Sequence, residues 1–256
     1  MKRIGWFTTA RGQGSMNLFR SILKKIEDKE IEVELAFMFI NRDIKGNENR
    51  RQMVQMAKDR GIPVIILPSD GFMPELKAND IEAWREEYGK EMRKLISPHR
   101  MDFGVLAGYM LILDPKTCME YVMINLHPAL PGTYQGTWEE VIEKVVENKD
   151  RSYGATVHIC TPDLDRGDAI AYDSFDVERL RSLARDDDEL RRMVRAEGVR
   201  REGHLLMSVI KHMVNGDLVI KGGKVYDREG KELERPPCLA KEIEAALADD
   251  RSVQAR

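Results

Sequence analysis

The chain has 256 residues, of which 42% are hydrophobic and 33% are charged, and its net charge is −3. This length suits one α/β domain or a domain with a small appendage, and the charge provides no broad basic field for nucleic acid. The three cysteines are scattered without Cys-x-x-Cys spacing, and no segment approaches the roughly 20 apolar residues of a membrane span. We therefore expect a cytoplasmic protein that binds neither nucleic acid nor a membrane.

Strands and helices alternate through the first half of the chain. This alternation implies parallel strands joined by crossover helices. Gly61 is a plausible end for the second helix, and Thr137-Trp138-Glu139-Glu140 has the spacing of a capping box that opens a helix reaching about residue 148. The expected strands of this half are 3–8, 31–40, 62–67, 103–107 and 122–127. The expected helices before the capping box are 15–28 (or 16–28), 48–60 and 81–96.

The second half has a different pattern. Two strands, 154–160 and 169–176, flank a loop at 163–167 and predict a hairpin-like extension of the sheet. Residues 186–215 are expected to be mostly helical, with a break near Gly198 or Gly203. A tight hairpin with Gly222-Gly223 at its turn is expected over 218–226, and a helical tail follows Pro236-Pro237.

The clearest chemical signal is the end of the strand at 122–127, which reads Asn125-Leu126-His127-Pro128. Alternate residues of a strand share a face, so an amide and an imidazole lie side by side. Pro128 has no N–H to continue the ladder and holds His127 extended. In open α/β sheets this edge is where ligands bind. From these residues alone, a functional site and a capped strand end are about equally good interpretations.

Three segments, in this order, resemble the folate-dependent formyltransferases. They are Ala107-Gly108-Tyr109-Met110, then Asn125-Leu126-His127-Pro128, then Gly154-Ala155-Thr156-Val157-His158 through Leu164-Asp165-Arg166-Gly167. The resemblance covers roughly residues 1–230, is clearest from about 103 to 172, and is greatest to members that formylate phosphoribosylglycinamide (GAR) in purine biosynthesis. It implies an α/β, Rossmann-like formyltransferase fold with a mostly parallel central sheet, helices on both faces, and a C-terminal helix plus hairpin. It also implies one domain over 1–235, with a phosphate-binding half (1–100) and a folate and catalytic half (101–235), and a helical tail at 236–256.

The resemblance assigns catalysis to Asn125, His127 and Asp165. Formyl transfer to an amine passes through a tetrahedral intermediate, whose oxyanion the Asn125 amide would stabilise. His127 would take or give a proton near neutral pH, and Asp165 would orient it. The cosubstrate would be 10-formyltetrahydrofolate, and no His, Cys and Asp cluster has metal-ligand spacing.

The resemblance also assigns two binding regions. The Gly-rich loop before the first helix would hold the phosphate of the acceptor, although as a pattern a plain tight turn explains it equally well. Acceptor-binding residues would be Arg11, Gly14, Ser15, Asn17, Gly108, Met110, Pro128 and Glu202, the last placed by counting back from Asn215-Gly216. Folate-binding residues would be Tyr109, Met110, Leu111, Ile112, Leu113, Pro162, Asp163 and Arg166.

The chain departs from the family pattern at several places. The first loop, 8–17, is not the usual short form, Pro131 replaces a second leucine, and residues 178–200 are longer and more charged than expected. Leu111 stands where many members carry an arginine that helps hold the folate. His158 is expected to be structural. The alternatives are a formyltransferase for an amino sugar nucleotide or another small amine, and a folate-binding sensor domain without turnover. The sequence leaves a homodimer open.

Overall fold

The computed structural model describes residues 1–163 and 166–254 and divides into two compact units. The first unit is Met1–Asn125 with Ile159–Gly167, and the second is Leu126–His158 with Asp168–Arg256. Across both, no helix in the described ranges is long and apolar enough to cross a membrane.

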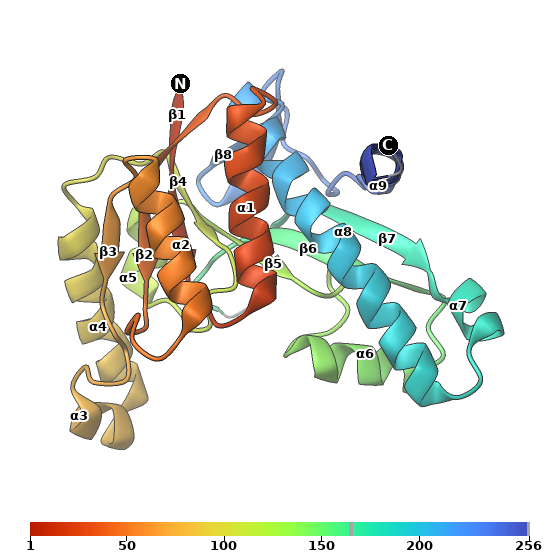
Figure 1. The fold of residues 1–256 in the computed structure, drawn as a ribbon, viewed down its shortest axis with the longest axis horizontal. Coiled ribbons are helices and arrows are strands. Elements are labelled where there is room, and N and C mark those ends of the chain that lie inside the picture. The colour runs from red at the N-terminus through yellow and green to blue at the C-terminus, as the bar shows by residue number, and fades with distance from the viewer. Residues whose placement is uncertain (164–165, 255–256) are drawn as a thin grey trace. The chain divides into compact units, whose positions relative to one another are not determined.

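Five parallel strands form the sheet of the first unit, in the order β3-β2-β1-β4-β5 (Figure 1). All five were predicted, although β3 has only three residues. Pro63 carries no N–H for the ladder, which begins at the next residue. The strands are β1 (Lys2–Thr8), β2 (Val33–Ile40), β3 (Val64–Ile66), β4 (Phe103–Leu106) and β5 (Met123–His127).

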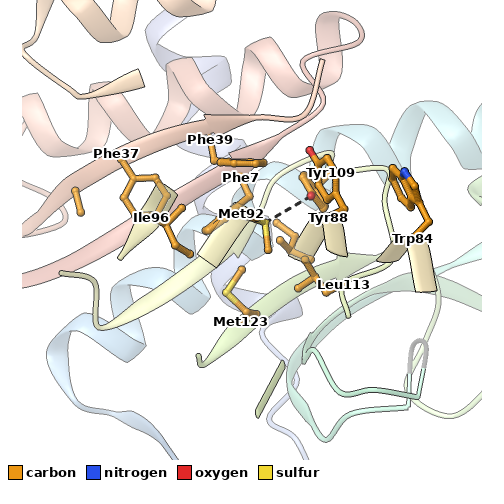
Figure 2. Packing of buried hydrophobic residues seen from close by; sticks show 12 residues of the cluster. Phe7, Phe37, Phe39, Trp84, Tyr88, Met92, Ile96, Tyr109, Leu113 and Met123 are labelled. Carbon is orange, nitrogen blue, oxygen red and sulfur yellow. Dashed lines mark hydrogen bonds between the residues drawn. The ribbon is translucent and has the colours of Figure 1, made fainter. Parts of the chain in front are cut away.

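Helices cover both faces of these strands. On one face Trp6 of β1 packs against Phe19 of α1 (Gln13–Glu27), with ring centroids 5.9 Å apart. On the other face Phe7 joins a cluster with Trp84, Tyr88 and other residues of α4 (Ile81–Ile96), which Figure 2 shows. The alternation of Trp6 and Phe7 along one strand thus builds two cores, as the period of two requires.

The other helices of this unit are partly as expected. Helix α2 (Glu48–Asp59) is followed by Gly61 at φ +68°, which confirms the predicted glycine end. Two six-residue helices were not predicted, α3 (Pro74–Asn79) and α5 (Pro115–Glu120). Each begins with proline, the residue whose missing N–H costs nothing at a first helical position.

The second unit confirms most of the predicted elements. Strands β6 (Ser152–Ile159) and β7 (Ala169–Asp176) are antiparallel, and α6 (Trp138–Glu147) begins at the predicted capping box. Strands β8 (Leu218–Lys221) and β9 (Lys224–Asp227) form the expected hairpin, with both turn glycines at positive φ. The C-terminal helix α9 is Ala240–Gln254, and a short helix, α7 (Val177–Leu183), follows β7.

The predicted break near Gly198 or Gly203 is wrong. Helix α8 (Asp187–Asn215) runs through both glycines without interruption for 29 residues. A glycine costs a helix only about 1 kcal/mol relative to alanine, which packing can offset. At Gly198 the packing is close, since an added Cβ would lie 3.0 Å from the ring of Tyr153.

Candidate active site

The predicted acceptor loop joins β1 to α1 in the first unit. Helix α1 begins at Gln13, so Gly14 and Ser15 lie in its first turn, where backbone N–H groups lack partners within the helix. Gly12, at the N-cap, gives no side-chain cap, and the first turn contains no acidic residue. This helix end therefore has donors and a partial positive charge that suit an anion. Arg11 and Asn17 are exposed beside it.

The segment 108–110 lies directly against this loop. The Thr9 N–H donates to the Gly108 carbonyl at 3.0 Å, and the Met110 N–H donates to Thr9 Oγ1 at 2.8 Å. Gly108 has φ +68°, and an added Cβ would lie 2.8 Å from Ser15 Oγ. The structure thus brings together two predicted groups of acceptor-binding residues that are about 90 positions apart in the chain.

The five residues predicted to line the folate cleft differ in exposure. Tyr109 and Leu113 are buried in the core cluster of Figure 2, and Leu111 packs against it. Burial raises the pKa of Tyr109 well above its usual value, so its hydroxyl stays neutral. The side chains of Met110 and Ile112 are exposed, by 62% and 37%. Of these five, the side chains most accessible to a ligand are Met110 and Ile112.

The loop predicted to carry the catalytic aspartate follows β6. Pro162, Asp163 and Arg166 are exposed, and the Arg166 N–H donates to the Asp163 carbonyl at 3.3 Å. An added Cβ on Gly167 would come within 1.7 Å of the Ile159 carbonyl, so this turn requires glycine. Asp165 itself lies outside the described residues.

Asn125 lies near the end of β5. It pairs in parallel register with Leu106, the last residue of β4, which leads into the 107–110 segment. Asn125 is half-buried, and His127 follows two positions later on the same strand. The predicted shared face of these two residues follows from this strand geometry.

In the second unit, His127 is only 8% exposed, and its ring position is held by a backbone group. Its Nε2 lies 2.9 Å from the carbonyl oxygen of Tyr134. Because a carbonyl can only accept, Nε2 donates the hydrogen in this contact. The ring of His158, which is buried in β6, is edge-on to that of His127 with centroids 6.2 Å apart.

Tyr134 is a residue of the candidate site that the sequence reasoning missed. Its hydroxyl donates to Asp150 Oδ2 at 2.7 Å and accepts from Asn148 Nδ2 at 2.9 Å. The hydrogen bond to Asp150 raises the pKa of Tyr134. These bonds brace the loop that carries the carbonyl partner of His127. An aromatic residue in a loop rich in proline and glycine was the available signal.

Glu202 lies on α8 in the second unit, where Pro128 is also placed. Its side chain is 17% exposed, and Arg195 Nη1 donates to it at 2.8 Å. Burial raises the pKa of Glu202, and the pairing with Arg195 opposes this. The Arg195 guanidinium stacks over Trp138 at 4.4 Å from the ring centroid, so the arginine is fixed from two sides. The sequence reasoning had not singled out Arg195 as the partner of Glu202.

Within the described ranges, no group of three His, Cys, Asp or Glu side chains could hold a metal ion.

Comparisons with known proteins show the family. The sequence model of the family described as "Formyl transferase" matches residues 10–201, about three quarters of the chain. The chain therefore belongs to the formyl transferase family and is a formyltransferase. This result confirms the family resemblance and the enzyme class that the sequence predicted, and solved structures that share the fold confirm the predicted fold class.

Similar curated proteins include phosphoribosylglycinamide formyltransferases from several organisms. That of Dictyostelium discoideum is 29% identical over 61% of this chain and 77% of its own length. That of Haemophilus influenzae is 26% identical over 87% of this chain and 92% of its own. That of Escherichia coli is 36% identical, but the match spans only 34% of this chain and 41% of that protein.

Solved structures show the same fold. A phosphoribosylglycinamide formyltransferase from Coxiella burnetii has a TM-score of 0.69 at 22% identity, covering 93% of this chain and 99% of the other. A formyltetrahydrofolate deformylase from Pseudomonas syringae has a TM-score of 0.65 at 22% identity, covering 88% of this chain and 65% of the other. Because the fold is shared by enzymes that transfer and enzymes that hydrolyse, it does not identify the acceptor.

Proposed function

We propose that the chain transfers the formyl group of 10-formyltetrahydrofolate to the amine of phosphoribosylglycinamide, a step of purine biosynthesis. The observation that carries the proposal is the Asn125-Leu126-His127-Pro128 strand end, with the two polar side chains on one face. The curated relatives that carry this activity in their names support the choice of acceptor.

In the proposed reaction the amine nitrogen attacks the formyl carbon and a C–N bond forms. The carbonyl oxygen becomes an oxyanion, to which the Asn125 amide donates a hydrogen bond. One such donor is worth about 2.7–4 kcal/mol of barrier. The bond from the formyl carbon to the folate nitrogen then breaks, and that nitrogen receives a proton.

His127 is proposed to take the proton from the attacking amine and to return it to the leaving nitrogen. The carbonyl of Tyr134, 2.9 Å from Nε2, fixes the position of the imidazole ring for this proton transfer. Asp165 is proposed to orient the histidine and stabilise its charged form.

We propose that the acceptor phosphate binds at the start of α1 through Gly14, Ser15 and Asn17, with Arg11 beside them. Gly108, Met110, Pro128 and Glu202 would hold the rest of the acceptor. The folate would use the segment 109–113 together with Pro162, Asp163 and Arg166. A pterin ring is bound largely by backbone donors and acceptors between apolar walls, which a segment with buried side chains can provide.

The test is formyl transfer to GAR by wild type, Asn125→Ala, His127→Ala and, as a matched control, His204→Ala. His204 lies on α8, paired with Asp250 at 3.2 Å, and has no part in the proposed chemistry. Wild type and the His204 variant should form formyl-GAR, and the other two should lose at least about a hundredfold.

Three outcomes would contradict the proposal. Near-wild-type turnover by His127→Ala or Asn125→Ala would remove the catalytic role of that residue. Release of formate without formyl-GAR would identify a hydrolase, and transfer only to an amino sugar nucleotide would identify a different acceptor.

A further inference from the structure

We propose that Thr9, held from α2 by Arg50, is a positioning residue that fixes the spacing between the acceptor loop (10–17) and the segment 108–110. The inference rests on the proposed function, because that function assigns these two segments to the reacting molecules. Neither Thr9 nor Arg50 belongs to the predicted binding or catalytic residues.

All three polar groups of Thr9 bond to other segments. Its N–H donates to the Gly108 carbonyl at 3.0 Å, and its Oγ1 accepts from the Met110 N–H at 2.8 Å. Its carbonyl accepts from Arg50 Nε at 3.3 Å. Thr9 is 3% exposed, so these bonds are shielded from competing water. One residue thus links the end of β1, the segment after β4 and helix α2.

The first turn of α2 holds the same loop at a second carbonyl. Asn47, the N-cap of α2, accepts from the Arg50 N–H through Oδ1, and its Nδ2 donates to the Arg11 carbonyl at 3.3 Å. Arg50 Nη1 also donates to the Asp43 carbonyl, which ties the arginine to the loop before α2. The loop between these two carbonyls contains Ala10 at φ +50°, a conformation that needs support from its surroundings.

The consequence for the reaction is geometric. A loop that binds a phosphate and a segment that binds the reacting ends must stay in register for the amine to reach the formyl carbon. Reacting atoms need to approach to about 3–3.5 Å, and a misplacement of about 1 Å can cost a hundredfold in rate. Thr9 controls this register, because it leads directly into the acceptor loop and bonds the segment 108–110 through both its N–H and its Oγ1.

The experiment compares Thr9→Val with Thr9→Ser, and Arg50→Met with Arg51→Met. Valine keeps the shape of threonine but removes the acceptor for the Met110 N–H, whereas serine keeps it. Arg51 is the matched control, since it is exposed on α2 and its guanidinium pairs with Glu48 on the same helix. Each variant is assayed with GAR and with the same acceptor lacking its phosphate.

For Thr9→Val and Arg50→Met we expect kcat/KM for GAR to fall by about tenfold to a hundredfold. For the acceptor without phosphate, which does not use the loop, kcat/KM should stay within about twofold of wild type. Thr9→Ser and Arg51→Met should match wild type with both acceptors. Equal losses with both acceptors, or failure of serine to restore activity, would show a merely structural role and overturn the proposal.

A second measurement separates this inference from the proposed function. Inorganic phosphate is titrated into each variant by calorimetry. If wild type does not formylate GAR but Thr9→Val and Arg50→Met weaken phosphate binding several-fold relative to Arg51→Met, the acceptor is wrong and the positioning role stands. Unchanged phosphate affinity in both variants, or no phosphate binding by wild type, would overturn the positioning role.

Discussion

Gly108 and Gly61 form a natural pair for testing the acceptor loop, because both have φ +68° but different surroundings. An added Cβ at Gly61 meets nothing within 4 Å, whereas at Gly108 it would lie 2.8 Å from Ser15 Oγ. Substituting alanine at each position therefore applies the same backbone penalty. Only the Gly108→Ala variant also displaces the Ser15 hydroxyl.

The expected loss of stability is nearly the same for both variants. A left-handed conformation costs an alanine about 1–2 kcal/mol, and in a chain of this size each kcal/mol lowers the melting temperature by roughly 2–4 °C. Both variants should therefore melt about 2–8 °C below wild type. The Cβ and Cα of Ser15 would be at 3.5 and 3.9 Å from the new methyl, which is ordinary contact, so rotation of the hydroxyl alone relieves the clash at Gly108.

The expected effects on activity differ. Moving the Ser15 hydroxyl out of the proposed phosphate site should raise KM for GAR by about tenfold in Gly108→Ala, the effect of one lost hydrogen bond to a charged group. Gly61→Ala should keep the wild-type KM. Steady-state kinetics and thermal unfolding measure both quantities.

The double variant Ser15→Ala with Gly108→Ala tests the cause. If the hydroxyl carries the effect, adding Gly108→Ala to Ser15→Ala should raise KM little further, and the two effects should be non-additive. An unchanged KM in Gly108→Ala, or an equal rise in Gly61→Ala, would refute the reasoning.

Three further predictions concern stability, pH and the folate tail. Arg201 and Asp173 form a buried pair with two hydrogen bonds, of 2.6 and 2.7 Å. Arg201→Met should therefore lower the free energy of unfolding, measured with denaturant, by about 3–5 kcal/mol, whereas Arg200→Met, at a more exposed position, should lower it by under about 1 kcal/mol. Similar losses in the two variants would contradict this prediction. Burial lowers the pKa of His212, but its hydrogen bonds to Glu242 and Asp217 outweigh burial and raise it above 6.5. A group whose pKa is raised in the folded state contributes its full stabilisation below the unfolded-state pKa, and this stabilisation is lost as pH rises through the folded-state pKa. Wild type should therefore lose stability relative to His212→Gln as pH rises between these two pKa values. Stability that varies with pH in the same way for both proteins would contradict this prediction. With Leu111 in place of a basic residue, KM should depend little on the number of glutamates in the folate tail, and strong, salt-sensitive tightening with longer tails would contradict this.

The elements that could be predicted are those whose local signals agree with their packing. The helix Ile81–Ile96 was predicted to the residue, because Asp80 caps it and its apolar stripe faces one core. The Gly222-Gly223 turn and the Thr137 capping box were predicted equally directly from the sequence. The turn needs residues that adopt positive φ, and the capping box needs side chains that bond the first backbone N–H groups of the helix. Helices α3 and α5 were missed because six residues contain less than two turns of periodicity.

The continuity of α8 shows the opposite case. Two glycines and alternating charges weakened the local helical signal, and the prediction placed a break there. In the structure Gly198 lies close to the Tyr153 ring, where an added Cβ would be in tight contact at 3.0 Å. The glycine that looks like a helix breaker is the residue that allows the helix to pack closely. This is information about a neighbour about 45 positions away, which a local pattern does not contain.

The same distinction applies to the site. Asn125 and His127 could be proposed as site residues from the sequence, because the proposed chemistry requires particular side chains at a fixed spacing on one strand. The supporting contacts were not identifiable, since the carbonyl of Tyr134 lies against His127 Nε2 and Arg50 donates to the carbonyl of Thr9 beside the acceptor loop. Any residue provides a carbonyl, so neither contact leaves a mark in the sequence. Variation in these supporting contacts can therefore change the acceptor or the rate while the Asn-x-His-Pro motif stays the same, and the departures of the 8–17 loop from the family pattern are the place in this chain to look for such an effect.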